Sequence, residues 1–118
     1  MSRSCRIRIN LSALPQSAAL QSQLKTLGFR LELEGLDLAT ASGFQGCVLD
    51  GEDAGFSVAH DEEGLMLRWS GDDREQCAAL MTAAAVQALS NAEVNIGAGA
   101  PLDTTALKAR VSELLEDM

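Results

Sequence analysis

Hydrophobic and polar residues alternate in several short stretches of the chain, which is the pattern of strands with one buried face. The first stretch runs from Cys5 to Leu11, and Arg6 and Arg8 make its outer face basic. Similar short stretches predict strands at 29–33, 47–49, 56–60, 65–69 and 93–96. Turns rich in glycine and acidic residues at 50–55 and 61–64 separate three of these strands. Such short connections favour an antiparallel meander.

Helical periodicity appears at both ends of the chain. Leu20, Leu24 and Leu27 form an apolar stripe between Pro15 and Gly28, residues that are typical of a helix start and a helix stop. A second helix begins at residue 103 or 104. Its apolar stripe consists of Leu107, Val111, Leu114, Leu115 and Met118.

The stretch from Ser70 to Ser90 predicts the central helix of the fold. Asp72 is a suitable N-cap, and Glu75 three residues later completes a capping-box pattern. From residue 77 to residue 89 only Thr82 and Gln87 are polar, so the helix is expected to be buried on nearly all faces.

Together these elements predict one two-layer α+β domain over residues 1–118. It has a mainly antiparallel sheet of about five strands, with helices packed on one face. The irregular stretch 36–46 is expected to be a loop. The length suits one domain, because domains commonly have about 100–150 residues.

The net charge of −8 is distributed unevenly along the chain. Residues 1–30 contain five basic residues and no acidic one, whereas all 17 acidic residues lie from Glu32 onward. An acidic surface repels phosphate groups, so we expect no nucleic-acid partner. The charge favours a basic protein as partner, or it keeps the protein in solution and has no further role.

Cys5, Cys47 and Cys77 are three in number and widely spaced, which argues against a disulfide framework and against a CxxC site. We therefore expect a reducing compartment, the cytoplasm. No apolar run suits a signal peptide or a membrane-spanning helix, and no membrane association is expected.

The sequence offers little for catalysis or for a cofactor. His60 is the only histidine, and no nucleophile occurs near it in a recognisable motif. The acids from Asp50 to Asp61 resemble a calcium loop in composition only, because Ala54 falls where a ligand is required. The stretch 97–100 matches neither the dinucleotide nor the P-loop motif. We expect no enzyme activity, metal or cofactor.

The acidic turns are the strongest candidate for a binding surface. Six acidic residues and no Lys or Arg lie between Asp50 and Glu63, divided between two turns. In a meander these turns lie at opposite ends of the strand that joins them, so they need not form one patch. Solvation of exposed turns is the simpler explanation. The predicted partner-binding residues are Asp50, Glu52, Asp53, Phe56, His60, Asp61, Glu62 and Glu63.

One run of residues also suggests a family. It comprises Gly43-Phe44, then residues 51–56 (Gly-Glu-Asp-Ala-Gly-Phe), then residues 67–72 (Leu-Arg-Trp-Ser-Gly-Asp), followed by Glu75 and an alanine-rich helix. Over roughly residues 43 to 105 the chain resembles small cytosolic immunity proteins encoded beside secreted bacterial antagonistic toxins, such as type VI or Rhs-type effectors. The resemblance implies a stoichiometric inhibitor of a cognate protein toxin. It assigns a role to no individual residue.

A secretion chaperone for an effector protein is the alternative. Such proteins are also small, acidic and α+β, and they are usually dimeric. In that case the C-terminal helix or an exposed strand edge would form the surface of a homodimer.

Overall fold

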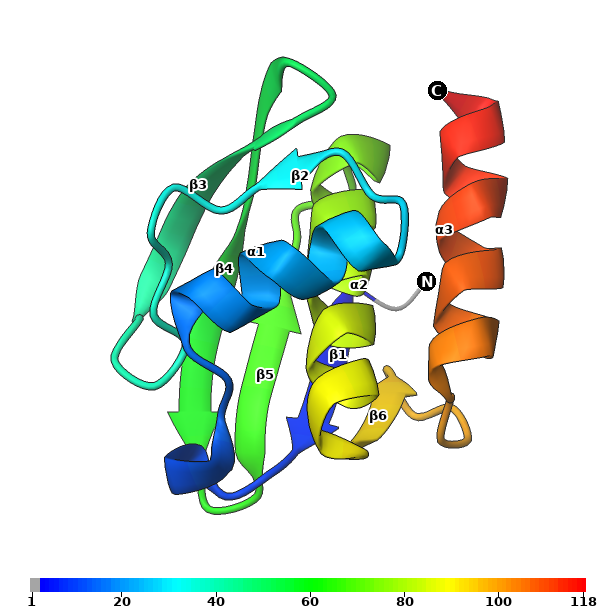
Figure 1. The fold of residues 1–118 in the computed structure, drawn as a ribbon. Helices are drawn as coiled ribbons and strands as arrows, with labels where there is room; N and C mark the ends of the chain where they lie inside the picture. The colour runs from blue at the N-terminus through cyan, green and yellow to red at the C-terminus, as the bar shows by residue number, and fades with distance from the viewer. Residues whose placement is uncertain (1–2) are drawn as a thin grey trace.

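The computed structural model describes residues 3–118, and within this range three α-helices lie on one face of a six-stranded sheet (Figure 1). The strands are β1 (Ser4–Arg8), β2 (Leu31–Glu32), β3 (Gly43–Leu49), β4 (Glu52–Asp61), β5 (Gly64–Arg68) and β6 (Glu93–Ile96). The helices are α1 (Ser17–Thr26), α2 (Asp73–Ser90) and α3 (Thr104–Asp117), with a short 3₁₀ helix at Leu11–Ala13. The predicted α+β architecture is confirmed, with six strands in place of about five.

The strand order in the sheet is β2-β3-β4-β5-β1-β6, and all neighbouring strands are antiparallel. Strands β3, β4 and β5 form the expected meander. The N-terminal strand β1 lies between β5 and β6, with Arg6 opposite Met66 and Arg8 opposite Gly64. This position brings the two arginines next to the turn that connects β4 to β5.

Helix α2 is the core helix that the sequence predicts. Every residue from Cys77 to Val86 is buried between the sheet and the other helices. The Asp72 side chain accepts a hydrogen bond from the Arg74 backbone N–H at 2.8 Å, which caps the helix start. Glu75 Oε1 accepts from the Ser70 backbone N–H at 3.1 Å and from the Ser70 hydroxyl at 3.0 Å. In a standard capping box Glu75 would bind the backbone N–H of the N-cap Asp72, whereas here it binds Ser70, two residues earlier.

Helix α3 packs mainly against α2, beside the sheet (Figure 1). Leu107 and Val111 are buried in this contact, and Leu114 is partly buried. The predicted stripe is too wide, because Leu115 and Met118 are 42% and 47% exposed. With α2 as the neighbour, only one narrow line of α3 side chains is covered.

Several element boundaries differ from those predicted. Gly43–Gly46 belongs to β3 and is not a loop, and β4 already begins at Glu52. The turn between them contains only Asp50 and Gly51, whose φ angles of 51° and 82° match a two-residue hairpin turn. Strand β1 ends at Arg8, and the predicted strand 29–33 shrinks to Leu31–Glu32.

Within residues 3–118, no helix combines the length and the apolar character needed to cross a membrane.

Candidate functional site

The two acidic turns lie at opposite ends of β4, as the meander predicts. Asp50 is in the β3–β4 turn, and Glu62 and Glu63 form the β4–β5 turn. Glu52 and Asp53 are strand residues at the start of β4, where Asp53 lies opposite Val48 on the sheet face that no helix covers. The eight predicted partner-binding residues therefore do not form one continuous surface.

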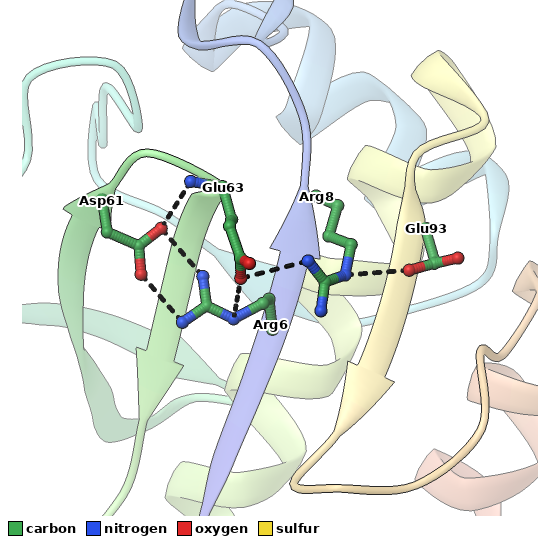
Figure 2. Close-up of polar contacts among 5 residues, drawn as sticks. All are labelled: Arg6, Arg8, Asp61, Glu63 and Glu93. Atoms are coloured by element: carbon green, nitrogen blue, oxygen red, sulfur yellow. Dashed lines mark hydrogen bonds and ion pairs between the residues drawn. The ribbon is translucent and has the colours of Figure 1, made fainter.

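The β4–β5 turn is held by arginines from β1 (Figure 2). The Arg6 guanidinium binds both carboxylate oxygens of Asp61, each at 2.8 Å, and its Nε lies 3.4 Å from Glu63 Oε2. Arg8 bridges Glu63 at 3.0 Å and Glu93 at 2.9 Å. The network thus joins three strands and the turn, and its two arginines face three carboxylates.

These contacts change the charge properties of the predicted site. The hydrogen bond from Arg6 holds the pKa of Asp61 below its usual range, helped by backbone N–H groups of the turn and by the arginine charge. Asp61 and Glu63 are therefore structural partners of β1. Glu62 has no ion pair among the described residues.

The acidic residues at the other turn are only partly paired. Glu52 Oε2 lies 2.7 Å from Arg74 Nη2, and Arg74 also donates to the Leu49 carbonyl at 3.0 Å. Asp50 meets Arg30 at 3.4 Å, but both side chains are largely exposed, so this pair stabilises little. Asp53 has no ion pair in the described part of the chain. The net negative charge of this turn is therefore exposed around Asp50 and Asp53.

Two of the predicted partner-binding residues do not lie on the surface available to a partner. Phe56 is 1% exposed and belongs to the core, so its assignment to the partner-binding surface is wrong. His60 points to the same inner face and is partly buried, and its Nε2 lies 2.7 Å from the Leu38 carbonyl. A carbonyl only accepts, so Nε2 donates this bond and holds the loop before β3 against β4.

The three cysteines are buried and carry no disulfide. Burial raises the pKa of the Cys5 thiol to about 12 and that of Cys77 to about 11. For Cys47, burial and then the nearby carboxylates of Glu34 and Glu75 raise the pKa to about 11. The thiolate is the nucleophile, so these thiols are protonated and unreactive at neutral pH.

No group of three or more His, Cys, Asp or Glu side chains that could hold a metal occurs in residues 3–118.

The surface that the sequence analysis missed is the uncovered face of the β3–β4 hairpin. Phe44 on β3 is 62% exposed, the most exposed of the large hydrophobic side chains in the described residues. Its ring lies across Gly55 of β4, where a Cβ would overlap it. Gly43-Phe44 is part of the run that suggested a family, but the irregular pattern around it predicted a loop.

A shallow hollow of about 380 Å³ lies beside Phe44. Its lining includes three carboxylates, those of Glu34, Asp53 and Glu75, and no basic residue. Phe44, Gly46 and the partly exposed Ala54 form the rest of the accessible wall. An exposed aromatic ring beside unneutralised carboxylates suits a cationic protein group.

Comparison with protein-family models, with curated proteins and with solved structures finds no match to this chain.

Proposed function

We propose that this chain is a non-enzymatic binding protein, an immunity protein that binds and neutralises a cognate bacterial toxin. The observation that carries this proposal is the exposed Phe44 beside the unpaired Asp53 on a sheet face without helices. Exposed aromatic residues are frequent anchors of protein interfaces.

The state of the reactive side chains supports binding over catalysis. The cysteine thiols are protonated because burial raises their pKa values. The His60 imidazole is engaged with the Leu38 carbonyl. Neither arrangement provides an activated nucleophile next to a general base.

The charge of the chain supports a basic protein as partner. With a net charge of −8, the protein repels phosphate groups and attracts basic surfaces, which speeds association with a cationic toxin. Neither a nucleic acid nor a membrane is therefore part of the proposal. We place the protein in the cytoplasm, because three unpaired cysteines suit a reducing compartment.

The test uses the toxin domain encoded by the reading frame next to this gene. In one variant, called the turn variant, Asp50→Asn, Glu52→Gln and Asp53→Asn remove three charges from the β3–β4 turn and the first two residues of β4. In the control variant Glu113→Gln, Glu116→Gln and Asp117→Asn remove three charges from exposed positions of α3. The two variants therefore have the same net charge and differ in where the charge was lost.

We expect the turn variant to associate about tenfold more slowly at low salt and with a weaker salt dependence, because steering charges next to an interface act mainly on the association rate. The α3 variant should stay close to the wild type. Equal rates for all three proteins would exclude the acidic turn as the interface. A wild-type chain that neither binds nor neutralises the toxin domain would refute the proposed function.

One observation favours a dimeric secretion chaperone instead, namely the exposure of Leu115 and Met118 on α3. An apolar strip on a terminal helix suits a homodimer. The two functions differ in the activity of the bound toxin. An immunity protein abolishes that activity, whereas a chaperone holds an export segment and leaves a folded toxin active.

A further inference from the structure

The edges of the sheet are protected unequally. At the β6 edge, the Leu102 backbone N–H donates to the Val94 carbonyl at 2.7 Å, which covers that strand with a short bridge. At the β2 edge, the Gln21 carboxamide donates to the Leu31 carbonyl at 2.8 Å and accepts from the Leu33 N–H at 3.0 Å. One glutamine side chain thus takes the place of a neighbouring strand. Proteins commonly block edges in this way, because free edges pair with other chains.

One stretch of edge has no such protection. Strand β2 pairs only with Val48 and Leu49 of β3, so β3 from Gly43 to Cys47 has a paired strand on the β4 side alone. The connection between β2 and β3 passes near this stretch without adding a strand to it (Figure 1). In the described residues, no backbone hydrogen bond joins the preceding segment 33–42 to Phe44 or Gly46. Phe44 and Gly46 are both exposed.

The direction of the backbone groups in this stretch follows from the hairpin. Leu49 and Glu52 flank the two-residue turn and form a hydrogen-bonded pair, and such pairs alternate along an antiparallel ladder. Residues 45 and 47 therefore bond to β4, and Phe44 and Gly46 direct their N–H and C=O groups away from it. The Asp50 N–H, which donates to the Arg30 carbonyl at 2.8 Å on the β2 side, agrees with this alternation.

The charge around this edge indicates what could bind there. Glu34 and Asp53 line the hollow beside Phe44 and Gly46, and Glu75 completes its acidic wall. A second copy of this chain would bring the same carboxylates against one another, and the net charge of −8 on each copy would add to the repulsion. A segment with lysine or arginine side chains would instead meet opposite charge and the face of an aromatic ring.

We propose that the β3 edge at Gly43–Cys47 binds an extended basic segment of the partner protein as an added antiparallel or parallel strand. Backbone hydrogen bonds to Phe44 and Gly46 supply the affinity, as in other cases of strand addition. A lysine or arginine side chain of the segment enters the hollow beside Phe44 and supplies the specificity. This inference rests on the proposed function, because it describes how the toxin is held.

Position 46 offers a matched pair of variants. Gly46→Pro removes the N–H that faces the open edge and no hydrogen bond to β4, and proline is tolerated on strand edges of this kind. Gly46→Ala keeps the N–H, and its Cβ meets no heavy atom within 4 Å. Both variants should keep the circular dichroism spectrum of the wild type.

The probe is an octapeptide with uncharged, blocked ends. Lysine occupies every second position, and valine or threonine occupies the others. The comparison peptide has glutamate in place of lysine. We expect the lysine peptide, at millimolar concentration, to shift the amide resonances of Phe44 and Gly46 in NMR spectra of the wild type. The Gly46→Ala variant should behave like the wild type, and the Gly46→Pro variant should bind at least tenfold more weakly. Glu34→Gln combined with Asp53→Asn should also weaken the binding, and more so at low salt.

The inference is wrong if the lysine peptide leaves these resonances unchanged, if the glutamate peptide shifts them equally, or if the two variants at position 46 bind the lysine peptide alike. A wild-type dimer that Gly46→Pro converts to a monomer would also overturn it, since the edge would then bind a second copy. With the toxin domain, equal binding by the Gly46→Pro and Gly46→Ala variants would refute the strand addition and leave the proposed function intact. Absence of binding by the wild type would refute the function itself.

Discussion

Replacing Ala84 by aspartate tests whether α2 is buried as the structure describes. Ala84 is 0% exposed, and Thr82 is the only polar residue among the fully buried side chains of the described chain. An aspartate at this position therefore has no cation to pair with. Its carboxyl group must stay protonated in the folded protein or unfold the helix.

The cost of this substitution follows from two terms. Keeping the carboxyl group protonated at pH 7, against an ordinary pKa near 3.9, requires a shift of about three units and costs about 4 kcal/mol. Inserting the extra atoms beside a fully packed helix adds about 1–3 kcal/mol. The sum of about 5 kcal/mol or more approaches the whole stability of an ordinary domain, which is about 5–15 kcal/mol.

The pH dependence separates these two terms. The pKa of the buried carboxyl group is raised in the folded state, so the electrostatic penalty is absent below the pKa of the unfolded chain and grows as the pH rises above it. At about pH 4, near the unfolded-state pKa, only the packing term should remain, and the variant should be more stable relative to the wild type than at neutral pH.

The measurement is urea unfolding followed by the fluorescence of Trp69, the only tryptophan, which is 6% exposed. The control is Ala88→Asp, one turn further along α2 at an exposed position. Helix propensity and the helix dipole together make the control about 1 kcal/mol less stable than the wild type. If Ala84→Asp lowers the free energy of unfolding no more than Ala88→Asp does at neutral pH, α2 is not buried as the structure describes.

Two further predictions concern the β4–β5 turn. Arg6→Gln should raise the pKa of Asp61 toward its ordinary value, as measured by NMR titration of the carboxyl group. The control Arg68→Gln, on the neighbouring strand, should leave this pKa unchanged. In the wild type the Arg6–Asp61 contact stabilises the fold above the unfolded-state pKa of Asp61, and this stabilisation is lost as the pH falls through the lower folded-state pKa. An unchanged pKa of Asp61 in Arg6→Gln would contradict the network. Gly64→Ala should destabilise the protein by about 2 kcal/mol or more, because the residue has a φ of 131° and a Cβ would overlap the Ile7 carbonyl. Gly46→Ala, whose Cβ meets open space, should stay within about 0.5 kcal/mol of the wild type. Thermal unfolding of both variants measures the two losses of stability, and equal losses would refute this explanation.

The sequence alone determines the elements that depend on local pattern. Alternation identifies β1 and places Arg6 and Arg8 together on its outer face, because side chains point to opposite faces at successive residues of a strand. The nearly continuous apolar sequence of α2 identifies it as a core helix, because a helix that is apolar on all faces is buried. The helices-on-sheet architecture follows from these elements with short connections.

Only the tertiary structure decides which residues can meet a partner. Alternation places Phe56 and His60 on one face of β4, but it does not say that α2 and the loop before β3 cover that face. It also cannot show that β1 inserts beside β5, where Arg6 offsets the charge of Asp61. Strand order depends on contacts between residues far apart in the chain, which no local pattern records.

Phe44 is the clearest example of this division. Its neighbours Gly43 and Gly46 break the local alternation, so its stretch resembles a loop in sequence. Pairing with β4 makes the stretch a strand, and the short length of β2 leaves its outer edge open. The sequence therefore determines the core of this protein, whereas the arrangement of the strands determines the surface available for binding.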